Sequence, residues 1–246
     1  MGFAISPDDR RIAVSVIEYS DSFQAPVKLR MYVEDLVGGG NHVDLFSSTS
    51  VTEWPIGWHA GRLLIAVGPP IGWSGPNVYG ATSYHLVDAT SGNRVATLDC
   101  VDGLVVAAGT ACYRFDRLPA QLGVQRWDGQ KSWFAGLNLG QPPEKSRIDV
   151  TVFGGPTLSP DGSRIAAAVY NAQGSPDINT TPVVLFTNGG EAPTAITGVV
   201  MGWLDSTHIV VHQHDSDTTI LDTASGATTK VASQGLLFGV LPGGLG

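Results

Sequence analysis

Short apolar runs separated by turn-forming residues extend along the whole chain. Three runs of small and branched apolar residues, at 62–67, 103–108 and 208–211, each follow a turn that contains Asp or Gly. Continuous runs of this kind are typical of strands that are covered on both faces. Helical spacing of apolar residues is not sustained, because Gly or Pro interrupts almost every candidate. The pattern predicts an all-β protein with buried inner strands.

A turn followed by a small-residue strand occurs twice. The sequence LSPDGSRIAAAV at 158–169 has a second copy near the N-terminus, ISPDDRRIAV at 5–14. Self-similarity at a period of roughly 40 to 50 residues is typical of a β-propeller, in which each repeat folds as one four-stranded blade. The duplicated turn therefore favours a propeller over a pair of β-sandwiches, which would give no reason for the repetition.

A second recurring unit is a hairpin. LVDATSGNRVA at 86–96 is echoed by ILDTASGATTK at 220–230. Asp accepts hydrogen bonds from backbone N–H groups two residues on, and Gly supplies a positive φ, so a D-x-x-x-G run closes two strands in a fixed register. Looser versions of the hairpin occur at 33–46, 124–134 and 183–196.

Five hairpins predict one propeller domain over residues 1–246 with five four-stranded blades. The expected blades span about 1–50, 51–99, 100–147, 148–198 and 199–233. A trailing strand within 234–246 is left over. It either pairs with the N-terminal blade and closes the ring, which we favour, or begins a sixth blade that is lost to truncation.

The SPDG turn followed by RIAAA, and the D-x-x-x-G hairpins, resemble the TolB-type and WD-like propeller repeats of bacterial envelope proteins. The likeness is specific at 6–9 and 159–162, whereas 57–61 (GWHAG) and 202–206 (GWLDS) replace the turn in two blades. The resemblance implies a binding or sensing module outside the cytoplasmic membrane. Such repeats also form the gating propeller of prolyl-oligopeptidase-like enzymes, whose hydrolase domain has no counterpart in this sequence.

The charge balance narrows the choice of partner. The formal net charge of -8 and the lack of a Lys/Arg cluster oppose binding to nucleic acid or anionic lipid. No apolar run approaches the roughly 18 residues of a membrane span. Met1 runs almost directly into the first repeat, so we expect a soluble part cut from a longer precursor that carries an anchor or signal peptide. The expected partner is a protein, peptide or glycan, and the expected location is the cell envelope or the outside of the cell.

The sequence contains none of the common enzyme motifs. The segment 72–76 (GWSGP) has Pro where a nucleophile elbow needs Gly, and Walker, Rossmann, H-E-x-x-H and C-x-x-C patterns are absent. We therefore predict no catalytic residue and no cofactor. The alternative is a five-bladed glycan hydrolase or lyase in which Asp35, Asp88, Asp128 or Asp222 converge in the central channel. Their places in or beside hairpin turns speak against it.

The best candidate for ligand binding is a long aromatic loop. Residues 68–80 exceed what a hairpin needs and put Trp73 and Tyr79 on the loop, with Tyr84 just beyond it. Exposed rings could stack on a sugar, a peptide proline or a partner surface. The alternative is that the rings are buried as packing.

A metal site is a weaker candidate. His212 and His214 are two residues apart, so on a strand they project from the same face and could share one ion. A third ligand has to come from elsewhere. The simpler interpretation is a solvated strand end that runs into an Asp-rich turn.

Tryptophans and cysteines have structural interpretations. Trp54, Trp58 and Trp203 fall near strand turns in corresponding repeats and are expected to fill the wedge between blades. If 104–108 is one strand, Cys112 lies opposite about residue 107 while Cys100 precedes the run, so a direct disulfide needs a bulge or another register. A disulfide would indicate an oxidising compartment, and free thiols would leave the compartment open.

Overall fold

The computed structural model describes residues 2–19, 26–68, 81–100, 105–114, 121–136, 146–148, 156–171, 181–213 and 217–233. These residues form antiparallel β-sheets and, within the described ranges, no helix. The chain divides into two compact units, Met1–Val101 and Asp102–Gly246. The expected trailing strand at 234–246 lies outside the described residues.

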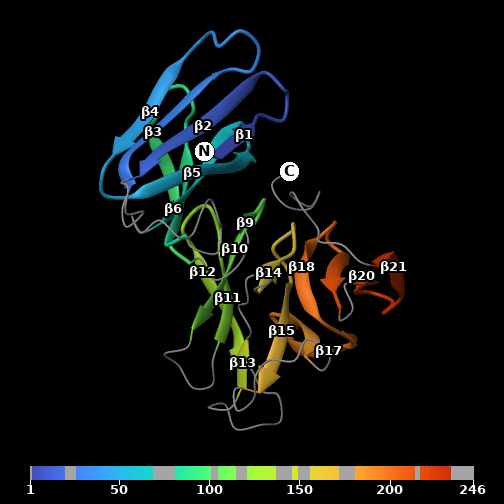
Figure 1. The fold of residues 1–246 in the computed structure, drawn as a ribbon. Helices are drawn as coiled ribbons and strands as arrows, with labels where there is room; N and C mark the ends of the chain where they lie inside the picture. Colours follow the sequence, from blue (N-terminus) through green and yellow to red (C-terminus); the bar gives the residue numbers. More distant parts are fainter. Residues whose placement is uncertain are drawn as a thin grey trace. The chain divides into compact units, whose positions relative to one another are not determined.

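The first unit contains two four-stranded sheets (Figure 1). The first sheet has the order β1 (Gly2–Ile5), β2 (Arg11–Tyr19), β3 (Pro26–Asp35) and β4 (Val43–Ser48). The second has the order β5 (Thr52–His59), β6 (Arg62–Gly68), β7 (Ser83–Val87) and β8 (Arg94–Leu98). In both sheets neighbours in sequence are neighbours in space, as expected of propeller blades.

The second unit contains three antiparallel sheets, two with four strands and one with five, which departs from the four strands expected of each blade. The first consists of β9 (Val105–Val106), β10 (Gly109–Arg114), β11 (Gln121–Gln125) and β12 (Lys131–Gly136). The next consists of β13 (Ser146–Ile148), β14 (Thr157–Leu158), β15 (Ile165–Asn171), β16 (Pro182–Thr187) and β17 (Gly190–Thr197), with β13 and β14 both paired to β15. The last consists of β18 (Val199–Trp203), β19 (His208–His212), β20 (Asp217–Asp222) and β21 (Thr228–Ser233).

Two of the three predicted inner strands are confirmed, and the third is shorter than expected. The runs at 62–67 and 208–211 form β6 and β19. In the described part of the run at 103–108, the strand is the two-residue β9, because a turn occupies Ala107 and Ala108 and β10 begins at Gly109. An added Cβ at Gly109 would lie 2.0 Å from the backbone oxygen of Gln125, so the chain can turn here only with Gly.

The duplicated SPD turn has the same internal hydrogen bonds in both copies. The hydroxyl of Ser6 donates to Asp8 at 2.6 Å and accepts from the backbone N–H of Arg11 at 2.9 Å. In the second copy Ser159 donates to Asp161 at 2.6 Å and accepts from the N–H of Arg164 at 3.0 Å. Each Asp thus fixes the serine that closes the turn, which explains why the motif recurs as a unit.

Adjacent sheets are joined by a tryptophan at corresponding positions. In the first unit β5 packs on β1, β2 and β3, and the Trp58 indole N–H donates to the backbone oxygen of Ala4 at 3.4 Å. In the second unit β18 packs on β14 and β15, and the Trp203 indole N–H donates to the backbone oxygen of Thr157 at 3.1 Å. Ala4 and Thr157 each stand two residues before the serine of their SPD turn, so the contact is repeated.

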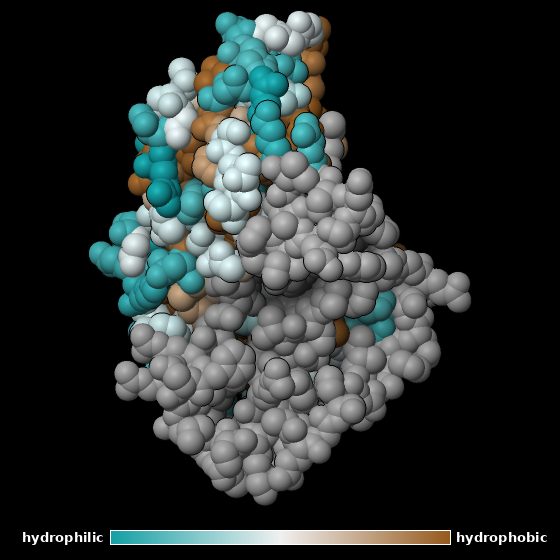
Figure 2. All heavy atoms as spheres, turned by 60° about the vertical axis from the view of Figure 1, so that its left-hand side comes forward, coloured by the Kyte–Doolittle hydropathy of each residue, from teal (hydrophilic) through white to brown (hydrophobic). Residues whose placement is uncertain are grey.

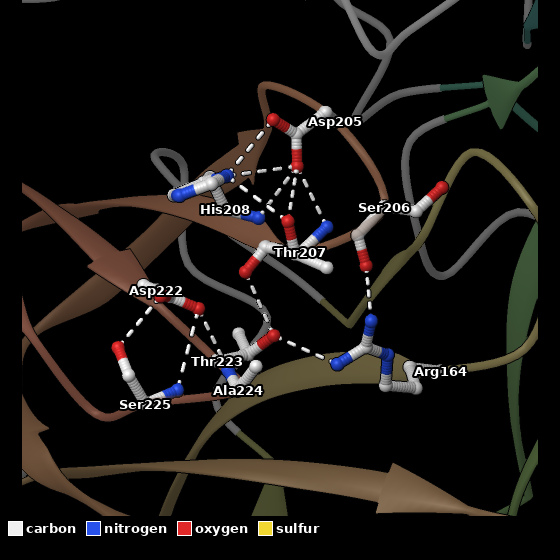
Figure 3. A network of polar contacts seen from close by, with 9 residues as sticks. All are labelled: Arg164, Asp205, Ser206, Thr207, His208, Asp222, Thr223, Ala224 and Ser225. Atoms are coloured by element: carbon white, nitrogen blue, oxygen red, sulfur yellow. Dashed lines mark hydrogen bonds and ion pairs between the residues drawn. The ribbon is translucent and has the colours of Figure 1, made fainter.

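An arginine at the end of each SPD turn makes a second contact between the same sheets. Arg164 donates to the hydroxyl of Thr223 at 2.8 Å and to the backbone oxygen of Ser206 (Figure 3). Its guanidinium also lies 5.7 Å from the ring centre of Trp203. The equivalent Arg11 is 3.4 Å from the backbone oxygen of Ala89. Thr223 and Ala89 each follow the Asp of a D-x-x-x-G hairpin, so the two duplicated motifs contact each other.

We expect the tryptophan hydrogen bond to contribute measurably to stability. Trp203→Phe keeps most of the ring but leaves the buried Thr157 carbonyl without its donor, so the free energy of unfolding should fall by about 1–2 kcal/mol in urea unfolding. Trp54→Phe is the matched control, because Trp54 and Trp203 are both 2% exposed and the Trp54 indole nitrogen has no partner among the described residues. Equal losses in the two variants would contradict the role of the hydrogen bond.

Candidate functional site

The longest connection between second and third strands belongs to the β5–β8 sheet. It runs from Gly68 at the end of β6 to Ser83 at the start of β7. The corresponding connections of the other sheets are shorter, at 19–26, 114–121, 171–182 and 212–217. The predicted loop residues Trp73 and Tyr79 fall in this connection but lie outside the described residues.

Three polar side chains lie at the end of the sheet from which this connection departs. Glu53 of β5 pairs with Val67 of β6, and Val67 pairs with Ser83 of β7. Directly paired residues project from the same face of a sheet, as do residues two apart on one strand, so His85 shares this face with Glu53 and Ser83. The side chains of Glu53 and His85 are 8% and 14% exposed. The hydroxyl of Ser15 on β2 donates to the backbone oxygen of Glu53 at 2.7 Å, which fixes the start of β5 against the first sheet.

Burial controls the ionisation of this group. Desolvation raises the pKa of Glu53 to about 7, although the positive charge of Arg94 opposes the rise. Desolvation also lowers the pKa of His85, and Arg94 adds to that effect. At neutral pH the imidazole is therefore uncharged, and its Nδ1 atom, 3.9 Å from Oε1 of Glu53, is too distant for a hydrogen bond. No group among the described residues donates a hydrogen bond to the Glu53 carboxyl.

A hydroxyl, an imidazole and a carboxyl, from Ser83, His85 and Glu53, are the groups of a catalytic triad. The contacts between them do not suit that role. The Ser83 hydroxyl is 3.5 Å from Nε2 of His85. Nη1 of Arg94 is closer to the same nitrogen, at 3.1 Å, and a guanidinium can only donate. Nε2 thus accepts from Arg94 and is not available to take the serine proton. The arrangement is better suited to receiving a hydrogen-bond donor at Glu53 than to nucleophilic catalysis.

The other predicted ligand-binding residue has a different environment from the one expected. Tyr84 lies in β7 and is 1% exposed, so its ring does not offer an exposed recognition surface. The sequence could not show this, because it does not say which face of β7 is covered. Glu53 was missed for a similar reason: only the burial of its strand gives the carboxyl its unusual environment.

The metal site stays a prediction. His212 is the last residue of β19, and His214 lies outside the described residues. Within the part of the chain that the structure describes, no group of three or more His, Cys, Asp or Glu side chains could hold a metal ion.

The four aspartates considered for a glycan hydrolase are engaged in their own turns. Asp88 accepts from the backbone N–H groups of Thr90 and Ser91, both at 2.9 Å, and these bonds lower its pKa. The hydroxyl of Ser225 donates to Asp222 and lowers its pKa in the same way. Asp35 and Asp128 also accept hydrogen bonds within their hairpins, from Asn41 Nδ2 at 2.8 Å and the N–H of Gln130 at 2.9 Å. Carboxylates with lowered pKa values, such as Asp88 and Asp222, are poor general acids.

A second polar network lies on β3 and β4. His42 contacts Glu34 at 2.9 Å and Asp44 at 3.4 Å, Arg30 contacts Asp44 at 2.9 Å, and the rings of His42 and Tyr32 are 4.8 Å apart. The hydrogen bond to Glu34 raises the pKa of His42. The described surface in Figure 2 shows hydrophilic side chains interspersed with apolar ones. We interpret this network as part of that solvated surface.

Both cysteines are in a disulfide, contrary to the geometry expected from the sequence. Cys100 and Cys112 are the only cysteines, so they are bonded to each other. The expectation failed because the turn comes earlier than predicted. Since Gly109 pairs with Val106 and Thr110 with Val105, Cys112 lies beyond the paired part of β9, toward the side from which Cys100 precedes it.

Comparisons with known proteins give the fold. No protein-family model and no curated protein matches the sequence. The chain is similar to BamB from Moraxella catarrhalis, with 13% identity, a TM-score of 0.40, and 92% of this chain and 59% of that chain covered. It is also similar to an acylaminoacyl peptidase from Pyrococcus horikoshii, with 12% identity, a TM-score of 0.51, and 94% of this chain and 38% of that chain covered. The chain has a β-propeller fold.

The predicted fold class is thereby confirmed, with five sheets as blades. The propeller spans less than two thirds of the length of either solved structure. At 12% identity the likeness to the peptidase extends to the fold alone. That residues 1–246 form one domain, and that the repeats are of the TolB or WD type, stay predictions.

We predict that Glu53 makes stability fall as pH rises. Its folded-state pKa of about 7 lies above the ordinary 4.5, so the folded protein holds this proton more tightly than the unfolded chain does. The loss begins near pH 4.5, is complete above pH 7, and amounts to about 3 kcal/mol. Urea unfolding of Glu53→Gln at pH 5 and pH 8 should lack this component, whereas the exposed control Glu18→Gln should retain it. Identical pH profiles for wild type and Glu53→Gln would contradict the burial of the charge.

We predict that reduction of the disulfide destabilises the protein. Closing a short loop in the unfolded chain contributes about 3 kcal/mol, so a reducing agent should lower the urea midpoint. The double variant Cys100→Ala/Cys112→Ala should not respond to the reducing agent. A wild-type midpoint that does not change on reduction would mean that the bond is not formed in solution.

Proposed function

We propose that this propeller is a non-catalytic binding module that recognises a protein, peptide or glycan through the connection end of the β5–β8 sheet. The observation that carries the proposal is the combination found there: the longest of the second-to-third strand connections departs next to a buried carboxyl without a described donor. Long connections on a rigid scaffold are common sites of recognition. Trp73 and Tyr79 would supply stacking surfaces from the connection itself.

The pKa values and the neighbours of the acidic residues favour binding over glycan hydrolysis. Hydrolysis needs two carboxyl groups about 5–10 Å apart, one of them with a raised pKa. Asp88 and Asp222 have lowered pKa values because their turns donate hydrogen bonds to them. Glu53 has a raised pKa, but its neighbours are His85 and Arg94, and no second described carboxyl pairs with it.

We further propose an extracytoplasmic location, in the cell envelope or outside the cell. The disulfide supports an oxidising compartment. The described residues contain no helix with the length and apolarity required to cross a membrane. The net charge of -8 favours a protein, peptide or glycan partner over nucleic acid.

The aromatic residues of the connection provide the test. In peptide and glycan arrays, the double variant Trp73→Ala/Tyr79→Ala should weaken binding by at least about tenfold, because aromatic anchors dominate recognition surfaces. Its unfolding midpoint should not change. Phe3→Ala is the control, since Phe3 is an aromatic residue with 64% exposure in β1. Wild-type binding that the double variant retains in full would contradict this location of the site.

A further inference from the structure

Glu53 is a buried acid whose capacity to accept hydrogen bonds is unused by the described residues. Its side chain is 8% exposed, and the cause of its raised pKa is desolvation alone. A carboxylate has about four acceptor sites, and burying it without donors is unfavourable. Such a group is retained at a cost to stability, which is typical of functional sites.

The neighbours of Glu53 are already engaged elsewhere. Nε2 of His85 accepts from Arg94 at 3.1 Å, and the hydroxyl of Ser15 donates to the backbone oxygen of Glu53 at 2.7 Å. Arg94 is an exposed residue of β8, directed to His85 instead of to the carboxyl. Among the described residues, the groups around Glu53 thus orient its strand and its neighbour, and none of them donates a hydrogen bond to the carboxyl.

We propose that the Glu53 carboxylate binds a cationic group of the partner, the ammonium or guanidinium of a basic peptide segment. This inference rests on the proposed function and assigns the chemistry of the same site. Charge-assisted hydrogen bonds from an N–H⁺ donor would satisfy a carboxylate to which no described residue donates, and they are strongest where water is scarce. The net charge of -8 attracts a cationic partner over longer distances.

The residues of β7 beside the carboxyl, and the residue that precedes this strand, keep part of their surface exposed. Thr82 is exposed and Ser83 is half-buried where the chain enters β7, and Ser83 stands on the same face as Glu53. His85 keeps 14% of its side chain exposed beside the carboxyl. A flexible amine or guanidinium on an extended side chain fits such a narrow approach better than a rigid sugar ring does.

Binding of a cation requires the ionised carboxylate, so a neutral Glu53 must first release its proton to solvent. With a pKa of about 7, the ionised fraction rises about tenfold between pH 6 and pH 8. Among the described residues, His85 and Arg94 are the titratable and charged groups around Glu53. β2 packs against β5 and carries Ser15 and Glu18. Because these residues are three positions apart, the side chain of Glu18 projects from the opposite face of the sheet to that of Ser15.

The test uses the full chain and an array of hexapeptides. Each sequence carries Lys or Arg at one position, or the uncharged analogues norleucine and citrulline. Wild-type protein should prefer the charged members, with a Kd about tenfold lower at pH 8 than at pH 6. Glu53→Gln should bind them at least about tenfold more weakly and without this pH dependence. Glu18→Gln removes the same charge from an exposed site and should behave as wild type.

The alternative outcomes separate this inference from the proposed function. Equal binding of charged and uncharged peptides, with no change in the Glu53→Gln variant, would overturn the cation site. This outcome would leave the proposal of a binding module intact. Binding to a glycan array but to no peptide would overturn the inference in favour of a sugar ligand. Binding of neither class by the wild type would contradict both proposals.

A small probe tests the site without a peptide. Butylguanidinium chloride should shift the carboxyl ¹³C resonance of Glu53 at pH 8 in a saturable manner, whereas butanol should not. Equal shifts at Glu53 and Glu18 would indicate a general ionic effect and would overturn the site. Circular dichroism checks that Glu53→Gln is folded in each experiment.

Discussion

Packing of one thin sheet on the next is the interaction on which this structure depends. A single four-stranded sheet cannot bury both of its faces, so its apolar side chains stay exposed to water until a neighbouring sheet covers them. The duplicated motifs place directional contacts at these faces. An indole N–H and a guanidinium, at Trp203 and Arg164 in one unit and at Trp58 and Arg11 in the other, reach backbone or hydroxyl oxygens of the adjacent sheet.

The same packing gives the candidate site its chemistry. β5 lies against the first sheet, and this contact removes water from Glu53 while the turn aspartates stay at exposed hairpins. Acidic residues therefore serve two purposes in this chain. The aspartates of the turns accept hydrogen bonds from their own hairpins and fix strand register, whereas Glu53 is held in a dry environment that resists its charge. The recognition that we propose at Glu53 would be a consequence of blade packing and not of a separate motif.

Much of the fold could be predicted from the sequence, because turn chemistry is local. The SPD turns and the D-x-x-x-G hairpins contain their own hydrogen-bond donors and acceptors. The sequence motif alone is therefore sufficient to recognise them. The length of β9 was not predicted correctly and the disulfide was left open, since both depend on the position of one turn at Ala107 and Ala108. A shift of that turn by two residues changes which residues face each other across the strands.

The candidate site was harder to predict, because burial is a property of the whole unit. Tyr84 and Glu53 lie on adjacent parts of one sheet, and only the packing shows that the ring is covered and that no described residue donates to the carboxyl. The most direct measurement is the titration of the Glu53 side chain by ¹³C NMR in the unliganded protein. The account predicts a pKa of about 7. A pKa at or below the ordinary 4.5 would show that the carboxyl is solvated or already paired, and would contradict the account.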